Sequence, residues 1–386
     1  MESMMAGSEL SIPYLSFVTS SRNDDHGSGM FKRMQTTLSS VVTQLERFKI
    51  NSEIVLVDYN PPADRPLLKD QLSWPSHTEY CTIRTIVVPT TIHKRYKISD
   101  KLNFNGWVAQ NVGLRRARGE FVLLSPIDNL FSNELLQFIS KRNLERDKIY
   151  RTDRCDVPTA VLEISSLDER LSFCRKNIIW IHTRYGSVPV VRTKKHHLRS
   201  RSLNFNLKSE KIPTLHTNGP DLLLMAKEAW FSLRGFPEID AFGLGFDSLP
   251  CYMAYLAGIQ ERILPESCCI YHIDHDSLWR DTQPSLLERV LFYCFADGIA
   301  IRMASALRAA SGIVPWKLSR RKTKIESLGF DHSTFDESRK IIIEMQTGKR
   351  SGVYNDSNWG LGNEGLEEYC IVKAGRDNQK VMISAS

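Results

Sequence analysis

The order of hydrophobic and polar positions predicts alternating strands and helices in the first part of the chain. Apolar runs of strand length lie at 12–20, 53–59 and 81–89, and each ends at polar or proline-containing sequence. Between the first two runs, apolar residues recur at helical spacing from 30 to 48. Strands that alternate with helices are typical of a parallel sheet covered by helices, so we expect an α/β fold.

The stretch from 111 to 131 carries the clearest signal of a site. It begins as a short helix, turns at Gly119 and continues as the apolar strand FVLLS, which stops at Pro126. Asp128 follows just beyond this strand. Open α/β sheets bind ligands at the carboxyl ends of their strands, and a carboxylate there suits a divalent cation that holds a diphosphate.

The middle of the chain is less regular. Ser132 is placed to cap a helix that begins at 133. The segment 148–157, KIYRTDRCDV, brings the alternating charges of Arg151, Asp153, Arg154 and Asp156 close together, which is typical of a solvated strand face. Residues 158–212 contain the basic sequence KKHHLRSRS and show no clear period, so we interpret them as an irregular insertion or acceptor lid.

Regular patterns return from 217 onward. We expect a short strand, a helix closed by Gly235, a helix that begins near Asp247, a strand at 262–264 and a strand that ends at His272, Asp274 and His275. The last hundred residues predict an amphipathic helix at 285–310, the basic sequence 317–324 and a helix near 334–346.

Composition favours a globular protein that binds anionic ligands. The chain has 386 residues, 42% hydrophobic content and a net charge of +7, which allows one large α/β domain with additions. This charge suits nucleotide diphosphates and does not require nucleic acid. The eight cysteines include no C-x-x-C pair, which favours reduced thiols over a zinc site. Without a secretory signal or a run of about eighteen apolar residues, a cytoplasmic protein is expected.

Several motifs follow one another in the order found in a known class of enzymes. They are SRNDD, VDYNPP, NVGLRRARGEF, IDNLF, YRTDRCDV, GPDLLLM, LRGFPE, GFDS and IYHIDH. Together they resemble the nucleotide-diphospho-sugar glycosyltransferases of the GT-A fold, in particular the family two type, over about residues 12–280. NDSNWGLGNE, near the C-terminus, also looks like the tail of this subgroup.

The resemblance implies a GT-A fold, which is a Rossmann-like, mostly parallel sheet flanked by helices. It divides the chain into a disordered tail (1–11), a glycosyltransferase domain (12–280) and a helical C-terminal extension (281–386). The 158–212 segment is then the insertion or acceptor lid of the second part.

The resemblance also implies a nucleotide site. Ser20 and Arg22, after the first strand, sit where such enzymes hold the nucleotide. Asp58 is similar to the acid that forms a hydrogen bond with the base. Asn111 and Arg115 lie on the helix that, in the family, faces the diphosphate.

For the cation, the resemblance implies Asp128 and His272. Asp128 matches the second acid of the D-x-D metal motif, but Pro126 replaces the first acid. Asp128, diphosphate oxygens, waters and one histidine can still complete a Mn²⁺ or Mg²⁺ shell. His272 occupies the position of a histidine ligand in some members; His275 competes for this role, and a buried structural histidine is the alternative for His272.

On the acceptor side, Asp247 in GFDS matches the acid that activates the acceptor hydroxyl, while a helix cap is the alternative. Asp221 in GPD is expected to position the sugar or the acceptor, or else to bond the adjacent loop.

The resulting functional prediction is an inverting glycosyltransferase that uses a nucleotide-diphospho-sugar donor, a divalent cation and an acceptor hydroxyl. Two alternatives remain at this point: a nucleotidyltransferase acting on a sugar phosphate, and a catalytically silent nucleotide-sugar-binding module. The acceptor is a glycan, a small molecule or a lipid-like compound. For the last of these, the basic C-terminal segment would make peripheral contact with a membrane.

Overall fold

The structure, a computed structural model, describes residues 12–25, 28–184, 186–190, 215–219, 221–240, 246–275 and 334–375. The predicted tail 1–11, the sequence KKHHLRSRS, the expected helix 285–310 and the basic sequence 317–324 lie outside these residues.

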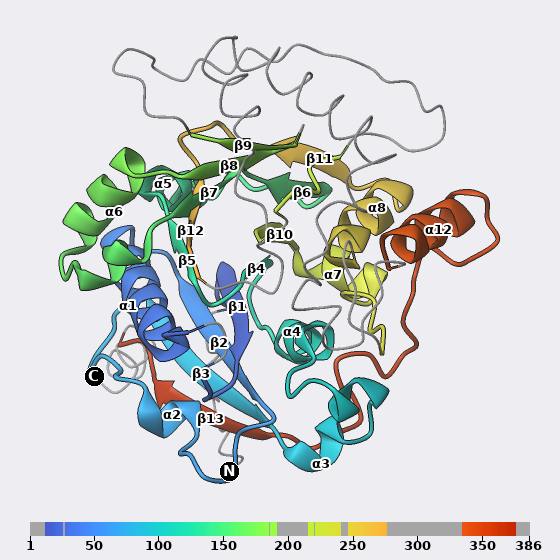
Figure 1. Cartoon of the computed structure of the whole chain (residues 1–386), viewed down its shortest axis with the longest axis horizontal. Helices are drawn as coiled ribbons and strands as arrows, with labels where there is room; N and C mark the ends of the chain where they lie inside the picture. The colour runs from blue at the N-terminus through green and yellow to red at the C-terminus, as the bar shows by residue number, and fades with distance from the viewer. Residues whose placement is uncertain are drawn as a thin grey trace, which may run out of the picture.

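The centre of the molecule is an eight-stranded sheet with the order β11-β6-β10-β4-β1-β2-β3-β13 (Figure 1). Its strands are β1 (Leu15–Ser21), β2 (Ser52–Tyr59), β3 (Cys81–Val88), β4 (Phe121–Leu124), β6 (Lys148–Arg151), β10 (Leu223–Ala226), β11 (Gln260–Ile263) and β13 (Glu367–Val372). Only β10 and β13 run antiparallel to their neighbours in this sheet of the described residues. The predicted, mostly parallel sheet is therefore confirmed.

A second sheet has the order β5-β12-β7-β8-β9. Its strands are β5 (Asn129–Phe131), β7 (Arg154–Val157), β8 (Trp180–Thr183), β9 (Gly186–Pro189) and β12 (Ile270–Ile273). Strand β5 follows β4 after four residues, and β7 follows β6 after two. The chain therefore crosses from the carboxyl ends of the central strands directly into the second sheet, so the polar residues at these crossings face the junction of the two sheets.

Helices flank the central sheet, with α1 and α4 on opposite sides of β1 and β2 (Figure 1). The α-helices are α1 (Met30–Arg47), α2 (Leu68–Gln71), α3 (Thr90–His93), α4 (Gly106–Arg115), α5 (Asn133–Ser140), α6 (Leu167–Lys176), α7 (Lys227–Leu233), α8 (Leu249–Leu256) and α12 (Thr334–Gln346). The described residues also form three short 3₁₀ helices, η1 (Lys97–Asp100), η2 (Thr159–Glu163) and η3 (Phe246–Ser248). This confirms the mixed α/β class, with a large central sheet flanked by helices.

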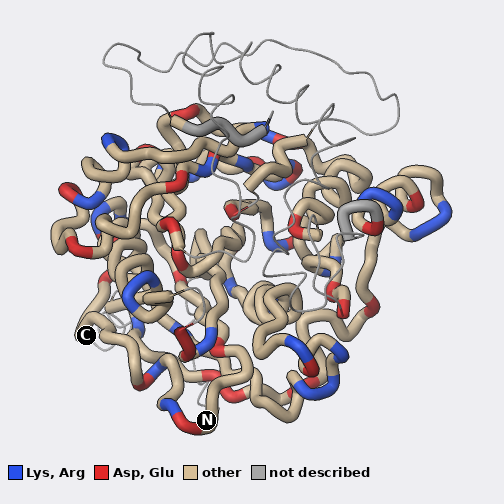
Figure 2. Tube along the Cα trace, in the orientation of Figure 1, with Lys and Arg blue, Asp and Glu red and all other residues tan. Residues whose placement is uncertain are grey.

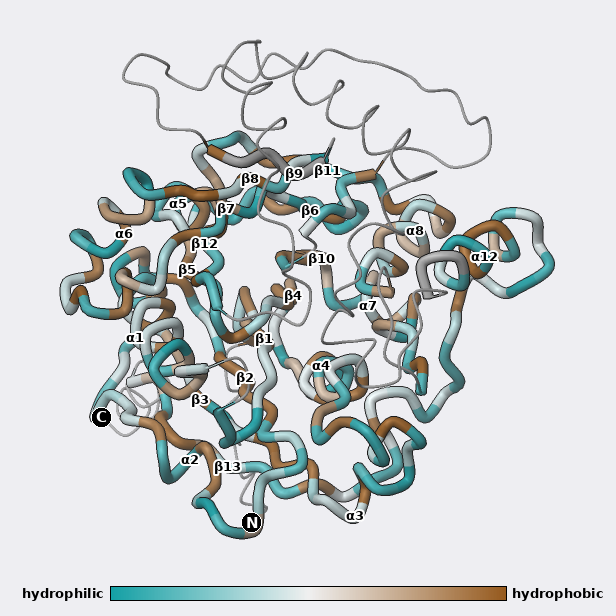
Figure 3. The backbone as a smooth tube through the Cα atoms, in the orientation of Figure 1, coloured by the Kyte–Doolittle hydropathy of each residue, from teal (hydrophilic) through white to brown (hydrophobic). Residues whose placement is uncertain are grey.

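The core is formed by the strands and by the helix faces that pack on them. Strand β2 is buried along its whole length, and the hydrophobic colour of Figure 3 follows β2 and β4. Helix α4 approaches β1 and β2 closely because Gly113 has no side chain. A Cβ atom at Gly113 would lie 2.6 Å from Val18 and 3.0 Å from Val57. A larger residue there would push α4 off the sheet.

Most elements match the sequence expectations, with two corrections. Helix α4 begins at Gly106, five residues before the predicted start, and the side chain of Asn105 caps it. Ser132 caps α5 as predicted, because its hydroxyl accepts a hydrogen bond from the N–H of Leu135 at 3.2 Å. The solvated face predicted for 148–157 is wrong: Arg151 is fully buried and Asp156 is 1% exposed. Strand β6 lies between β11 and β10 in the central sheet, and β7 lies between β12 and β8 in the second sheet, which local charge alternation could not reveal.

The described C-terminal residues belong to the same body as the sheet. Strand β13 pairs antiparallel with β3, and Asn355 donates hydrogen bonds to the carbonyl oxygens of Arg234 and Phe236. The region after 281 thus adds a strand as well as the helix α12. The predicted domain boundaries stay predictions.

Charged residues of both signs are interspersed along the described chain (Figure 2). Among the described helices, none has the length and apolar content needed to cross a membrane.

Candidate metal and nucleotide site

Strand pairing brings Asp128 and His272 together. Asp128 directly precedes β5, which pairs antiparallel with β12 so that His272 lies opposite Asn129. The N–H of Ile273 donates to the carbonyl oxygen of Asp128 at 3.1 Å, which fixes this crossing. As a result, Nε2 of His272 lies 3.8 Å from Oδ2 of Asp128. The two cation ligands predicted from the sequence are therefore neighbours.

His275 joins the same cluster, two residues beyond the end of β12. Its Nε2 atom lies 3.3 Å from Oδ2 of Asp128. One ligand atom from each of Asp128, His272 and His275 can be chosen so that all three lie within 4.8 Å of one another. Two ligands that each lie about 2.1 Å from one cation are separated by roughly 3–4 Å. The distances of 3.3 and 3.8 Å from Asp128 to the two histidines lie in this range, so the three side chains could hold a single divalent ion. His272, the ligand expected from the sequence, and His275, its competitor, therefore both lie beside Asp128.

The carboxylate of Asp128 is buried and lies close to a fixed positive charge. Asp128 is 5% exposed, and Nε of the fully buried Arg33 lies 3.8 Å from its Oδ2. Burial acts to raise the pKa of Asp128, but the neighbouring His272, His275 and Arg33 outweigh burial and hold this pKa well below its usual range. Asp128 therefore stays ionised, as a cation ligand must.

A second buried carboxylate, Asp156, lies behind the cluster. Strand β7 pairs parallel with β12 and places Asp156 opposite His272. Its Oδ1 atom lies 3.2 Å from Nδ1 of His272 and accepts a hydrogen bond from Nε of Arg154 at 2.8 Å. Its Oδ2 atom lies 3.1 Å from Nε2 of His182. Burial acts to raise the pKa of Asp156, and these three partners outweigh it, so the pKa lies far below its usual range.

The network continues toward the predicted acceptor side. Arg154 also forms an ion pair of 2.5 Å with Asp221, so it bridges Asp156 and Asp221. The carboxylate of Asp221 in turn influences half-buried Asp247 in η3. Burial, and after it the charge of Asp221, raises the pKa of Asp247 to about 6. Polar contacts therefore link Asp128 and His272 to Asp221 through Asp156 and Arg154. Asp247 lies near enough to Asp221 for the two carboxylates to repel each other, which places it on the same side of the sheet as this network.

The proposed nucleotide residues Ser20, Arg22 and Asp58 lie together at the carboxyl ends of β1 and β2. Ser20 is opposite Val57 in the parallel register. Arg22 forms an ion pair with Asp24 and donates from Nε to the carbonyl oxygen of Asn60 at 2.6 Å. These contacts place a polar rim beside Asp58.

Asp58 has a spare acceptor in a buried position. It is 1% exposed, its Oδ2 accepts the N–H of Leu68 at 2.7 Å, and its Oδ1 has no hydrogen-bond partner in the structure. Burial raises the pKa of Asp58 to about 6, against the opposing effects of the Leu68 N–H and Arg22. A buried acceptor without a partner is rare in native proteins, and a donor from a ligand would satisfy it.

Asp58→Asn should change the pH dependence of stability. The pKa of Asp58 is about 6 in the folded protein and 3.8 ordinarily, so the folded state holds an extra proton between these values. The contribution of the Asp58 carboxyl to the free energy of unfolding is then fully present below about pH 4. It is lost as the pH rises through 6, by up to about 3 kcal/mol. The variant lacks this loss. In urea unfolding, the free energy of unfolding of the variant minus that of wild type should therefore increase from pH 4 to pH 7. A difference that stays constant over this range would contradict the assignment.

Asn111 and Arg115 do not support their expected role at the diphosphate. The amide nitrogen of Asn111 donates to the carbonyl oxygen of Phe236 and to Glu238, and its oxygen accepts the N–H of Phe236. The guanidinium of Arg115 donates to the carbonyl oxygens of Ser357 and Trp359. These two side chains instead attach α4 to the 236–238 loop and to the C-terminal sequence NDSNWGLGNE.

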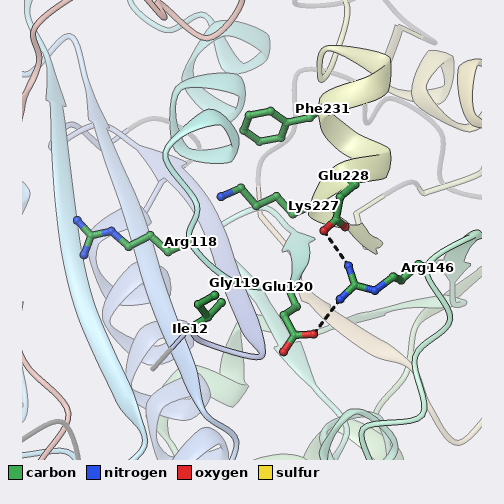
Figure 4. A pocket seen from close by; sticks show the side chains of 8 residues that line it. All are labelled: Ile12, Arg118, Gly119, Glu120, Arg146, Lys227, Glu228 and Phe231. Carbon is green, nitrogen blue, oxygen red and sulfur yellow. Dashed lines mark hydrogen bonds and ion pairs between the residues drawn. The ribbon is translucent and has the colours of Figure 1, made fainter. Parts of the chain in front are cut away.

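A surface hollow of about 590 Å³ lies elsewhere, beside the amino end of β4 (Figure 4). It is lined by Ile12, Arg118, Gly119, Glu120, Arg146, Lys227, Glu228 and Phe231. Arg146 joins Glu120 and Glu228 there through ion pairs of 3.1 and 2.7 Å. The predicted site residues are absent from this lining, and Asp58 and Asp128 lie at the opposite, carboxyl ends of β2 and β4.

Comparison with known proteins adds little to this geometry. No family model matches the chain, and no curated protein matches its sequence. Among solved structures, a crystal structure of GalNAc-T7 with UDP, GalNAc and Mn²⁺ is similar, with 13% identity and a TM-score of 0.39. The match covers 88% of this chain and 58% of the other. A likeness of this degree carries no argument about activity, so the function is inferred from the chain's own residues.

Proposed function

We propose that this chain is a glycosyltransferase that moves a sugar from a nucleotide-diphospho-sugar to an acceptor hydroxyl with the help of a divalent cation. The observation that carries the proposal is the cluster of Asp128, His272 and His275 past the carboxyl end of β4. Asp58, with its spare buried acceptor, lies at the carboxyl end of β2 in the same sheet as β4. Cation ligands and an acceptor for a base therefore occupy the edge where α/β sheets bind nucleotides.

Asp128, His272 and His275 would hold the cation, and their chemistry narrows its identity. Two imidazole nitrogens and one carboxylate suit Mn²⁺ better than Mg²⁺, which prefers an all-oxygen shell. When bound, such a cation supplies positive charge that offsets the charge developing on the nucleoside diphosphate as it leaves. The buried guanidinium of Arg33, 3.8 Å from Asp128, adds a fixed positive charge to the same region.

Asp247 is the proposed general base. A pKa of about 6 makes its carboxylate ionised at neutral pH and yet a stronger base than an ordinary aspartate. It would remove the proton of the acceptor hydroxyl as that oxygen attacks the anomeric carbon. A single base, with no enzyme nucleophile on the opposite face of the sugar, gives direct displacement and inversion of configuration.

The two alternatives are less well supported by the residues. A nucleotidyltransferase would use a glycine-rich phosphate loop followed by a lysine near the first strand, and SRNDDHGSG does not have this pattern. The silent binding module was favoured by Pro126, which removes one acid of the D-x-D motif. His275 offers a third cation donor at the same place, so the cluster has a full set of protein ligands without that acid.

A donor screen tests the proposed function. The chain is incubated with a panel of nucleotide-diphospho-sugars, Mn²⁺ and a panel of candidate acceptors that carry hydroxyl groups, and release of the nucleoside diphosphate is measured. We expect release from one donor class, which chelator abolishes, followed by an increase in acceptor mass equal to one sugar residue in mass spectrometry. Release of inorganic diphosphate from a nucleoside triphosphate and a sugar phosphate would instead establish the nucleotidyltransferase alternative.

The finer assignments remain predictions. These are the family two type, the donor sugar, a cytoplasmic location and peripheral membrane contact through 285–324. Residues 285–324 lie outside the described residues.

A further inference from the structure

The buried carboxylate of Asp156 has no role in the function proposed so far. It is 1% exposed and sits in the middle of the second sheet, between β12 and β8. Isolating a charge from water costs several kcal/mol, and a hydrophobic residue at such a position is often at least as stable. A buried aspartate with one arginine and two histidine partners therefore needs an explanation beyond packing.

The contacts of His272 explain why a carboxylate is buried at this position. Its two ring nitrogens face different carboxylates, because Nδ1 lies 3.2 Å from Asp156 and Nε2 lies 3.8 Å from Asp128. The alignment at Nδ1 is not that of a full hydrogen bond, although the distance is within reach of one. A neutral imidazole carries its proton on only one nitrogen, and a carboxylate facing Nδ1 favours the proton there. The lone pair of Nε2 is then directed to the cluster.

We propose that Asp156 is a positioning residue for the cation site, and this inference rests on the function proposed above. Asp156 holds His272 in the tautomer with hydrogen on Nδ1 and keeps the ring oriented toward Asp128 and His275. Partners of this kind orient histidine ligands and make them more basic, and their loss typically weakens metal binding 10- to 100-fold.

Arg154 extends this role to the acceptor side. Its guanidinium reaches Asp156 at 2.8 Å and Asp221 at 2.5 Å, so it fixes the positions of both carboxylates at once. The register supports the same arrangement, because Arg154 lies opposite Ile270 in β12, two residues before His272. The orientation of the cation ligand and the position of Asp221 therefore depend on one half-buried side chain, Arg154.

His182 provides a matched control. Its Nε2 lies 3.1 Å from Oδ2 of Asp156, so it contacts the same carboxylate as His272. His182 is not part of the cation cluster. A substitution at His182 therefore perturbs Asp156 without removing the contact between Asp156 and His272.

The test measures Mn²⁺ binding to the full chain by calorimetry, without donor or acceptor. Asp156→Asn should raise the Mn²⁺ dissociation constant about 10- to 100-fold, while His182→Gln should change it by less than about threefold. Equal affinities of Asp156→Asn and wild type would overturn the inference, as would an equal loss in both variants, which would indicate a general structural role.

A second measurement uses only the wild-type protein, so it is informative even if Asp156→Asn does not fold. The ¹⁵N chemical shifts of His272 in the metal-free protein report its tautomer. We expect hydrogen on Nδ1, and hydrogen on Nε2 would overturn the inference. If wild type binds no Mn²⁺ but shows the Nδ1–H tautomer, the proposed function fails while the orientation of His272 by Asp156 is supported.

Discussion

Asp128→Ala should abolish donor turnover, with a loss of about a thousandfold or more. Asp128 supplies the only negative charge among the three cluster ligands, and its Oδ2 is the atom that His272, His275 and Arg33 all approach. Without it, two imidazoles and a guanidinium would face the cation, and the guanidinium would repel it. A metal ion contributes several kcal/mol to stabilising a charged leaving group, which corresponds to this loss in rate. Steady-state release of nucleoside diphosphate is the measurement.

The control for this variant is Asp168→Asn. Asp168 is an exposed aspartate that pairs with Arg47 at 2.6 Å, and surface pairs of this kind contribute little. It should keep wild-type activity and wild-type Mn²⁺ affinity. Circular dichroism should show that Asp128→Ala remains folded. Full turnover by Asp128→Ala, or by wild type in excess chelator, would contradict the cation assignment.

Asp247→Asn should lower turnover by about two orders of magnitude while leaving donor affinity nearly unchanged. Asparagine keeps the shape of the side chain but cannot accept the acceptor proton. In wild type, turnover should rise with pH through about 6, because the base must lose its own proton and its pKa is about 6. In the variant this rise should be absent. Rates and pH profiles at saturating donor provide the measurement.

The competing explanation for Asp247 is that it caps α8. The side chain of Ser248, the N-cap residue of α8, makes no capping hydrogen bond, whereas the N–H of Ser248 lowers the pKa of Asp247. A local contact with the helix start is therefore present. Since asparagine caps as well as aspartate, the cap explanation predicts that Asp247→Asn keeps nearly full turnover. That result would remove Asp247 from the mechanism.

The strand pattern was the most predictable part of this protein. Apolar runs located β1, β2, β3 and β4 within a few residues, because buried parallel strands must be apolar on both faces. The proximity of Asp128 and His272 was expected only through a resemblance. Its physical cause, the pairing of β5 with β12, joins segments more than a hundred residues apart, and neither segment specifies the other.

Asp156 and Asn111 have contacts that sequence reasoning did not foresee. Asp156 belongs to a charged segment that looks solvated, and only the second sheet explains its burial. Asn111 lies on the expected helix, but its amide is satisfied by the distant residues Phe236 and Glu238. For His275 a signal was present, since a second histidine three residues after His272 follows the end of a strand. Two histidines that follow a buried strand so closely merit equal weight as ligands.

The central claim is that Asp128, His272 and His275 bind a divalent cation together with a nucleoside diphosphate. Calorimetric titration of nucleoside diphosphates into the wild-type protein, with and without Mn²⁺, tests it most directly. We expect binding of at least one nucleoside diphosphate to tighten about tenfold or more when Mn²⁺ is present, and this gain to disappear in Asp128→Ala. Equal affinity with and without Mn²⁺, or an equal gain in Asp128→Ala, would contradict the claim.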